Sequence, residues 1–88
     1  MGVTWGDFEP RRGLVPLYRQ LSGFVSARID AGDLQPGDGL PSERELADLT
    51  GLSVDTVRQS YAVLRDAGLI ATARGIGSFV ADPPRQSG

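Results

Sequence analysis

The sequence predicts a single, mainly α-helical domain in which three helices are followed by a small β-hairpin. Three observations lead to this fold class. Apolar residues repeat with the period of an α-helix across residues 14–31. Two segments that each open on a serine and close on a glycine follow across residues 42–68. Two short β-prone runs then flank a glycine-rich turn across residues 69–81, and 88 residues suffice for one compact core.

The composition excludes several kinds of chemistry. The chain has no cysteine and no histidine, so it offers no disulfide, no thiolate and no imidazole as a general base or metal ligand. No convergent pair of carboxylates is evident, and we expect neither an enzyme nor a metal or cofactor site. No apolar run approaches the roughly 20 residues of a membrane span, and the N-terminus lacks a signal pattern. We therefore expect a cytoplasmic protein without a membrane segment.

The first helix is expected over residues 14–31. Pro16 suits its first turn, and Gly32 supplies its C-terminal stop. Pro36 and Gly37 then fit the central positions of a type II turn. This turn is no phosphate-binding loop, because such a loop also needs a lysine and the chain has none. The core stripe of the helix consists of Leu17, Leu21, Phe24, Val25, Arg28 and Ile29.

A capping box opens the second helix. Ser42 is followed three residues later by Glu45, and Pro41 forces an extended approach to the cap. Gly51 ends this helix in a left-handed conformation. The apolar side is formed by Leu46, Ala47 and Leu49.

The third helix opens at Ser53, with Asp55 in its first turn, and closes at Gly68. Leu52 is expected to be a buried plug in the turn before it. The core stripe of this helix consists of Val57, Tyr61 and Leu64.

The small Ala47, the turn residue Gly51 and the branched Val57 have the spacing of a helix-turn-helix. A β-hairpin follows over residues 69–81, with its turn at 74–77. A hairpin in this position is a wing, so the predicted fold is a winged helix-turn-helix of three helices plus a wing. Such a fold presents the second helix of its pair to the major groove of DNA.

The ends of the chain are expected to lie outside this domain. Residues 1–13 mix charge, glycine and proline without a sustained period, which predicts a flexible N-terminal arm. Within the arm, Trp5 or Phe8 either packs on the domain edge or contacts a partner in a dimer. The winged domain then covers 14–82, and 83–88 form a C-terminal tail.

The charge balance weighs against simple electrostatic binding to DNA. The net charge is −2 and the pI is about 4.8, whereas a free-standing DNA-binding domain is usually basic. All nine positive charges are arginine, the residue best suited to bidentate contacts with guanine or phosphate. We expect weak binding as a monomer and steep salt dependence. The alternative function is a protein-interaction winged helix without specific DNA binding.

A specific, ordered set of short motifs runs through residues 16–80. It comprises Pro16-Leu17-Tyr18, Leu40-Pro41-Ser42-Glu43-Arg44-Glu45-Leu46-Ala47, Thr56-Val57-Arg58, Leu64, Gly68-Leu69-Ile70 and Gly75-x-Gly77-Ser78-Phe79-Val80. This set resembles the DNA-binding domain of the GntR family of bacterial transcription regulators. Tyr61 and the Pro-Leu-Tyr opening are similar to the YtrA-like or MocR-like branches.

The resemblance implies a sequence-specific regulator, most often a repressor, that binds a palindromic operator in double-stranded DNA as a homodimer. The recognition helix at 53–67 would enter the major groove, and the wing at 69–81 would lie on the minor groove or backbone. The family usually carries a C-terminal effector domain, whereas this sequence stops eight residues after Val80. The chain is therefore either a fragment of a longer regulator or a short regulator. We expect an effector ligand only if a C-terminal effector domain exists.

The resemblance also assigns DNA contacts to single positions. Arg44 and Arg58 could instead pair only with Asp48 and Asp55 on their own helices. The positions that the resemblance places on bases or backbone are Arg44, Ser53, Thr56 and Arg58 on the helix pair, and Arg74 with Gly75 at the wing tip.

Two positions depart from the family pattern. Val54 stands where the family commonly has arginine, and Asp55 follows it. Val54 can contact a thymine methyl and Asp55 can accept from a cytosine amine, so we expect a different operator preference. Ser42 and Ser53 are helix caps first, and the amides at these helix N-termini are candidate phosphate donors. Arg65, at the far end of its helix, is expected to be only a solvated charge.

Overall fold

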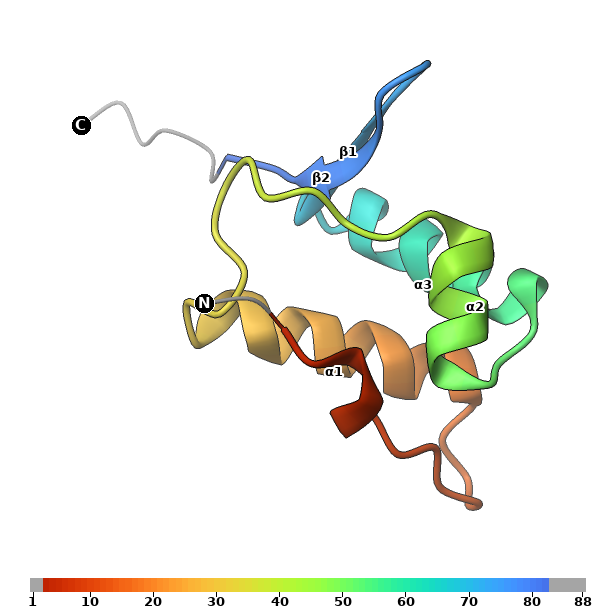
Figure 1. Cartoon of the computed structure of the whole chain (residues 1–88). Coiled ribbons are helices and arrows are strands. Elements are labelled where there is room, and N and C mark those ends of the chain that lie inside the picture. Colours follow the sequence, from red (N-terminus) through yellow and green to blue (C-terminus); the bar gives the residue numbers. More distant parts are fainter. Residues whose placement is uncertain (1–2, 83–88) are drawn as a thin grey trace.

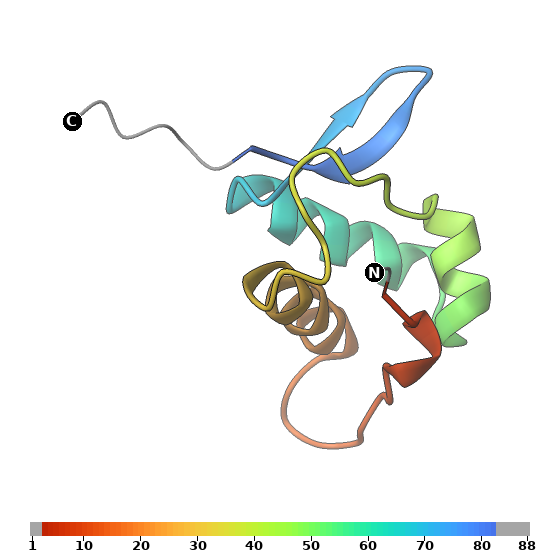
Figure 2. The ribbon, with the colours of Figure 1, turned by 60° about the vertical axis from the view of Figure 1, so that its left-hand side comes forward.

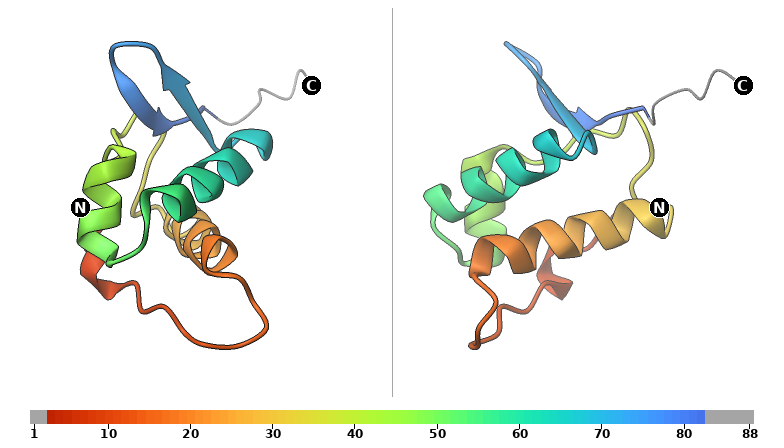
Figure 3. Two further views of the ribbon diagram at one scale, coloured as in Figure 1. Left: turned by 90° about the vertical axis from the view of Figure 1, so that its right-hand side faces the viewer. Right: turned by 180° about the vertical axis from the view of Figure 1, so that it is seen from behind.

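Three helices and a hairpin form the fold (Figure 1). The structure is a computed structural model that describes residues 3–82. Helices α1 and α3 pack against each other at an angle, and α2 packs against α3 near one of its ends (Figures 2 and 3). The elements in chain order are the 3-10 turn η1 (Trp5–Asp7), α1 (Leu17–Asp30), α2 (Glu43–Thr50), α3 (Val54–Asp66), β1 (Ile70–Ala73) and β2 (Gly77–Val80).

The predicted caps set the bounds of α2 and α3. The Ser42 hydroxyl accepts from the Glu45 amide at 3.1 Å, and the Glu45 carboxylate accepts from the Ser42 amide at 3.4 Å. This confirms the capping box, which satisfies two otherwise free amides. Gly51 ends α2 at a φ of +76°, in the left-handed region, and Ser53 then caps α3 as predicted.

The core lies between α1, α3 and the base of the hairpin. Two polar groups inside it are hydrogen-bonded: Ser60 Oγ donates to the Tyr18 carbonyl at 2.7 Å, and the Tyr61 hydroxyl donates to the Pro41 carbonyl at 2.7 Å. These bonds are needed because an unpaired buried hydroxyl destabilises the fold. The buried apolar residues are Phe8, Leu21, Val25, Leu34, Leu46, Ala47, Val57, Tyr61, Leu64, Ile70 and Val80.

The hairpin is antiparallel, and Ile70 pairs with Val80 at its base. The segment before α2 pairs with the outer edge of β2, which sequence patterning did not predict. Gly39 forms an isolated bridge with Phe79, and the Leu40 amide donates to the Ser78 carbonyl at 2.9 Å. The wing is therefore fixed on one side by the chain that leads into the second helix.

The N-terminal segment packs on the core along part of its length. Phe8 is buried, and its ring lies 5.5 Å from the Phe24 ring in an edge-to-face arrangement. The Trp5 ring lies 6.1 Å from the same phenyl group. Of the two roles considered for these aromatics, packing on the domain edge is the one observed. The core thus extends beyond the predicted boundary at residue 14, and the predicted tail lies outside the described residues.

Several details of the predicted helices are wrong. Helix α1 begins at Leu17 rather than at residue 14, because Pro16 has an extended backbone (ψ 149°) and forms the N-cap. Leu17 is 40% exposed, and Leu49, expected on the apolar side of α2, is 54% exposed. Leu52 is half-buried rather than a fully buried plug. Leu17 and Leu49 follow the helical period but remain exposed to solvent, whereas Leu52 lies in the turn after α2 and packs partly against the core.

Tyr61 makes stability sensitive to alkaline pH. Burial, assisted by the negative charges of Glu43 and Glu45, raises the pKa of its hydroxyl above the usual value of 10.0. Below that value both states keep the proton; above it the unfolded chain loses the proton first. We expect the free energy of unfolding to fall as pH rises above 10.0, with a slope approaching about 1.4 kcal/mol per pH unit.

Urea titrations between about pH 8 and 11 measure this slope, within the usual alkaline range for tyrosine. Tyr61→Phe should lose this dependence, whereas Tyr18→Phe should keep it. The chain has no lysine to titrate in the same range. An unchanged slope in Tyr61→Phe would contradict the assignment.

Candidate nucleic-acid interface

The N-terminus of α2 is the point at which the predicted DNA-binding elements meet. A salt bridge from Arg58 Nε to Glu43 Oε1, 3.2 Å long, joins the outer face of α3 to the first turn of α2. The hydrogen bond between the Leu40 amide and the Ser78 carbonyl joins the approach to α2 to the wing. Two contacts between residues far apart in the sequence thus connect α2 to α3 and to the wing.

The serines at the helix starts serve first as caps. Ser53 Oγ accepts from the Thr56 amide at 3.1 Å and also bonds Thr56 Oγ1 at 2.9 Å. Ser42 takes part in the capping box of α2. The hydroxyls of Ser53 and Thr56 are thus engaged with each other, and Ser53 is exposed at the tip of the recognition helix.

Arg58 is held by two carboxylates. Besides Glu43 on α2, its NH1 group lies 3.0 Å from Asp55 Oδ1, one turn back on α3. The guanidinium side chain is 56% exposed and the Asp55 side chain is 88% exposed. The predicted pairing of Arg58 with Asp55 is therefore present, and the cross-helix contact with Glu43 is an addition that helical spacing could not reveal.

The outer face of α3 also carries a polar residue that the sequence analysis omitted. Gln59 is exposed one turn after Asp55, beside Arg58, and its amide has the donor and acceptor pair that reads adenine. The i, i+3, i+4 spacing from Asp55 could have identified it. Val54, in contrast, is half-buried and packs against the core, which leaves only part of its side chain for a base methyl.

Arg44 and Arg74 are both exposed. Arg44 lies in the first turn of α2, and the ion pairs found within residues 3–82 do not include one between Arg44 and Asp48. Arg74 and Gly75 form the wing turn, where Gly75 has a φ of +81°. Next to them, Ile76 is 81% exposed, and no sequence motif had indicated it as a contact residue.

Arg65 links the end of the recognition helix to the wing, so its prediction as a merely solvated charge is wrong. Its NH1 group donates to Thr72 Oγ1 at 3.1 Å. Thr72 Oγ1 in turn shares a hydrogen bond with Ser78 Oγ across the two strands, at 2.9 Å. The strand pairing sets Thr72 opposite Ser78. This chain of polar contacts connects the end of α3 to both strands of the wing.

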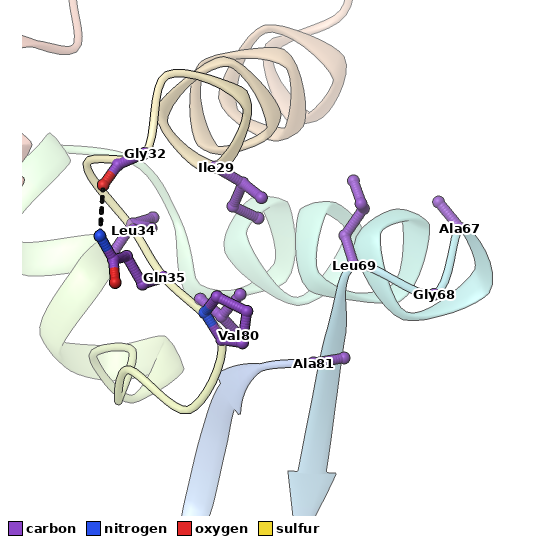
Figure 4. A pocket seen from close by; sticks show the side chains of 10 residues that line it. Ile29, Gly32, Leu34, Gln35, Ala67, Gly68, Leu69, Val80 and Ala81 are labelled. Carbon is purple, nitrogen blue, oxygen red and sulfur yellow. Dashed lines mark hydrogen bonds between the residues drawn. The ribbon is translucent and has the colours of Figure 1, made fainter. Parts of the chain in front are cut away.

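A pocket of about 390 Å³ lies at the other end of the molecule, where α1, α3 and β2 end (Figure 4). Its lining is mainly apolar, with Ile29, Leu34, Leu69 and Val80 among its walls.

In the part of the chain that the structure describes, no group of three or more metal-binding side chains occurs. No helix among those described residues is long and apolar enough to cross a membrane.

These features define the molecule as a winged helix-turn-helix domain. Residues 17–80 match the family model described as bacterial regulatory proteins of the gntR family. The chain belongs to the GntR family. This confirms the family suggested by the sequence motifs, while its branch within the family stays a prediction.

Relatives carry names of regulators and repressors. An HTH-type transcriptional regulator of Mycobacterium tuberculosis is 44% identical over 91% of this chain and 30% of its own length. The histidine utilization repressor of Klebsiella aerogenes is 37% identical over 90% of this chain and 33% of its own length. The transcriptional repressor NagR of Bacillus subtilis is 42% identical over 78% of this chain and 28% of its own length. The chain thus spans about a third of the length of these relatives.

Solved structures have the same fold. YtrA from Sulfolobus acidocaldarius, a GntR-family transcription factor, superposes with a TM-score of 0.81 at 32% identity, covering 88% of this chain and 82% of that one. The AraR DNA-binding domain in complex with operator ORX1 has a TM-score of 0.76 at 32% identity, covering 81% of this chain and 92% of that one. The predicted winged helix-turn-helix is confirmed.

Removing the Thr72 hydroxyl should loosen the wing. In Thr72→Val, Arg65 and Ser78 lose their shared partner, and we expect a loss of stability of about 0.5–1.5 kcal/mol. The Ile76 amide, which donates to the Ala73 carbonyl at 3.1 Å, should exchange faster with solvent.

Amide hydrogen exchange measured by NMR tests this prediction. Thr72→Ser keeps the hydroxyl and should exchange at the same rate as the wild type. Equal exchange rates at Ile76 in Thr72→Val and the wild type would show that the polar chain does not restrain the wing.

Proposed function

We propose that this chain binds a specific operator in double-stranded DNA and regulates transcription, acting as a repressor. Helix α3 enters the major groove, and the wing contacts the minor groove or its phosphates. The observation that carries the proposal is the meeting of α3, the wing and the N-terminus of α2 through the Arg58–Glu43 and Leu40–Ser78 contacts. Exposed arginines lie on each of these three elements: Arg44, Arg58 and Arg74.

Relatives support this proposal. The names of the histidine utilization repressor and of NagR are those of repressors. The AraR domain, of similar fold and 32% identity, is described in complex with operator DNA. The alternative, a protein-interaction winged helix, is not favoured by these relatives, and the acidic composition is the one observation on its side.

Each side chain in the proposed interface has a role that suits its chemistry. Arg44 and Arg58 donate to guanine or to an adjacent phosphate. The amides at the starts of α2 and α3, next to Ser42 and Ser53, donate to phosphates. The remaining proposed contacts are Thr56 on backbone, Val54 and Asp55 on thymine and cytosine, Gln59 on adenine, and Arg74, Gly75 and Ile76 on the minor groove.

The proposal includes two copies on a palindrome. A single domain with a net charge of −2 gains little affinity from attraction to phosphates. In a dimer, the binding of one copy to its half-site raises the effective concentration of the other copy at the second half-site, which multiplies the affinity for the whole operator. The recognition helices of such a dimer contact half-sites about one helical turn of DNA apart. The protein works in the cytoplasm, where bacterial DNA lies. An effector ligand is part of the proposal only if the protein has a C-terminal domain beyond this winged helix.

The binding proposal is tested by selection from a randomised DNA library. We expect the chain to enrich a palindromic sequence and to bind it at least about 10³-fold more tightly than a scrambled duplex in moderate salt. Affinity for both duplexes should fall steeply as salt rises. A selection that enriches no sequence, or equal affinity for the enriched and scrambled duplexes, would refute specific recognition.

Single arginine substitutions test the proposed contacts. Arg44→Ala should weaken the complex with the enriched site by about 1–3 kcal/mol and relax the preference for one base pair. Arg74→Ala should weaken both specific and scrambled complexes, because the wing mainly contacts the backbone.

Arg19→Ala, on the exposed side of α1, removes the same charge from outside the proposed interface and is the matched control. Fluorescence anisotropy gives the affinities of the wild type and the three variants for both duplexes. If Arg19→Ala weakens binding as much as Arg44→Ala, the effect is one of total charge and the assigned contact is wrong.

A further inference from the structure

We propose that Glu43 and Asp55 form an ion-pair clamp around Arg58 that lowers non-specific binding to DNA and so sets the specificity of the recognition helix. This inference rests on the proposed function, since it concerns how the same face distinguishes an operator from other DNA. It assigns Glu43 and Asp55 a role beyond base contact. They hold the arginine in place, and their negative charges oppose the approach of a phosphate.

The clamp is defined by two contacts from different helices. Glu43 Oε1 accepts from Arg58 Nε at 3.2 Å, and Asp55 Oδ1 accepts from Arg58 NH1 at 3.0 Å. Glu43 is the first residue of α2 and Asp55 lies in the first turn of α3. The carboxylates therefore hold the guanidinium from two directions at the helix-turn-helix junction.

Two carboxylates around one guanidinium leave a local net charge of −1. A phosphate brings a further negative charge, so Asp55, whose side chain is 88% exposed, repels it directly. The edge of a guanine is neutral overall and presents two acceptors, N7 and O6. The clamp thus penalises a phosphate far more than a guanine, although both are acceptors that an arginine can bind.

The clamp also leaves donors free for a base. An arginine has five N–H groups, and the two contacts use one at Nε and one at NH1. The remaining N–H groups, including both on NH2, suffice for a bidentate contact with guanine. The side chain is already held in place before DNA arrives, so less rotamer freedom is lost on binding.

In this arrangement, the acidic composition of the chain lowers its non-specific affinity for DNA. Non-specific binding depends mainly on neutralising phosphates, so removing positive charge weakens it for every sequence equally. Specificity is a difference between two affinities, and it rises when the non-specific one falls more. Val54, which stands where the resemblance leads us to expect arginine, acts in the same direction, because it adds no charge beside the clamp.

Asp55→Asn tests the clamp. The amide keeps an acceptor oxygen but removes the charge. Taking about 5 Å between Asp55 and a phosphate in water, we expect about fourfold tighter binding to a random-sequence duplex in low salt. The enriched operator should gain less, so the ratio of the two affinities should fall. Asp66→Asn, at the far end of α3, makes the same chemical change and should shift both affinities equally and by less than twofold.

Equal shifts for Asp55→Asn and Asp66→Asn on the random duplex would overturn the proposal, because net charge alone would then explain them. Asp55→Ser gives the same comparison if the amide variant folds poorly. The random duplex needs no operator, so this comparison stands even if the library selection enriches nothing.

The clamp has a second readout in the DNA-free protein. The Arg58 Nε–H group, bonded to Glu43, should give a distinct NMR signal that exchanges slowly with solvent. Glu43→Gln should speed this exchange and tighten binding to the random duplex. An Arg58 Nε–H signal that exchanges as fast as that of Arg44 in the wild type would show that the clamp does not form in solution.

Discussion

The hydrogen bond from the Tyr61 hydroxyl to the Pro41 carbonyl is the interaction on which the interface depends. The Tyr61 ring is buried in the core, so its hydroxyl must bond inside the protein, and the available carbonyl lies just before α2. This bond ties the start of one helix to the middle of the next. The same stretch of chain pairs with β2 through Leu40, so the wing is fixed from the same point.

In the proposed function, specificity for DNA follows from the placement of charge rather than from its total. The acidic chain cannot rely on general attraction to phosphates, which supplies most non-specific affinity. Its exposed arginines at the interface instead lie singly, on α2, α3 and the wing. Glu43 and Asp55 hold Arg58 in place, and their two negative charges more than offset its positive charge. Such a surface favours a base edge that presents acceptors without a full charge.

Features encoded by neighbouring residues were predictable from the sequence, and contacts across long separations were not. Ser42 with Glu45, Gly51 and Ser53 fixed the two helices because caps act within a single turn. The Arg58–Glu43 pair spans 15 residues and depends on how α2 crosses α3, so periodicity could not reveal it. Nor does any local pattern require the chain at Gly39 to pair with Phe79.

Glu43 interacts with three features of the fold at once: the dipole of α2, the Tyr61 hydroxyl and the Arg58 guanidinium. Its charge lies in the first turn of α2, where the helix dipole favours an anion. The same charge helps to raise the pKa of Tyr61 and accepts from Arg58 across the junction. In the clamp proposal, the residue that stabilises the start of α2 is thus also one that holds Arg58 and makes the DNA contacts selective.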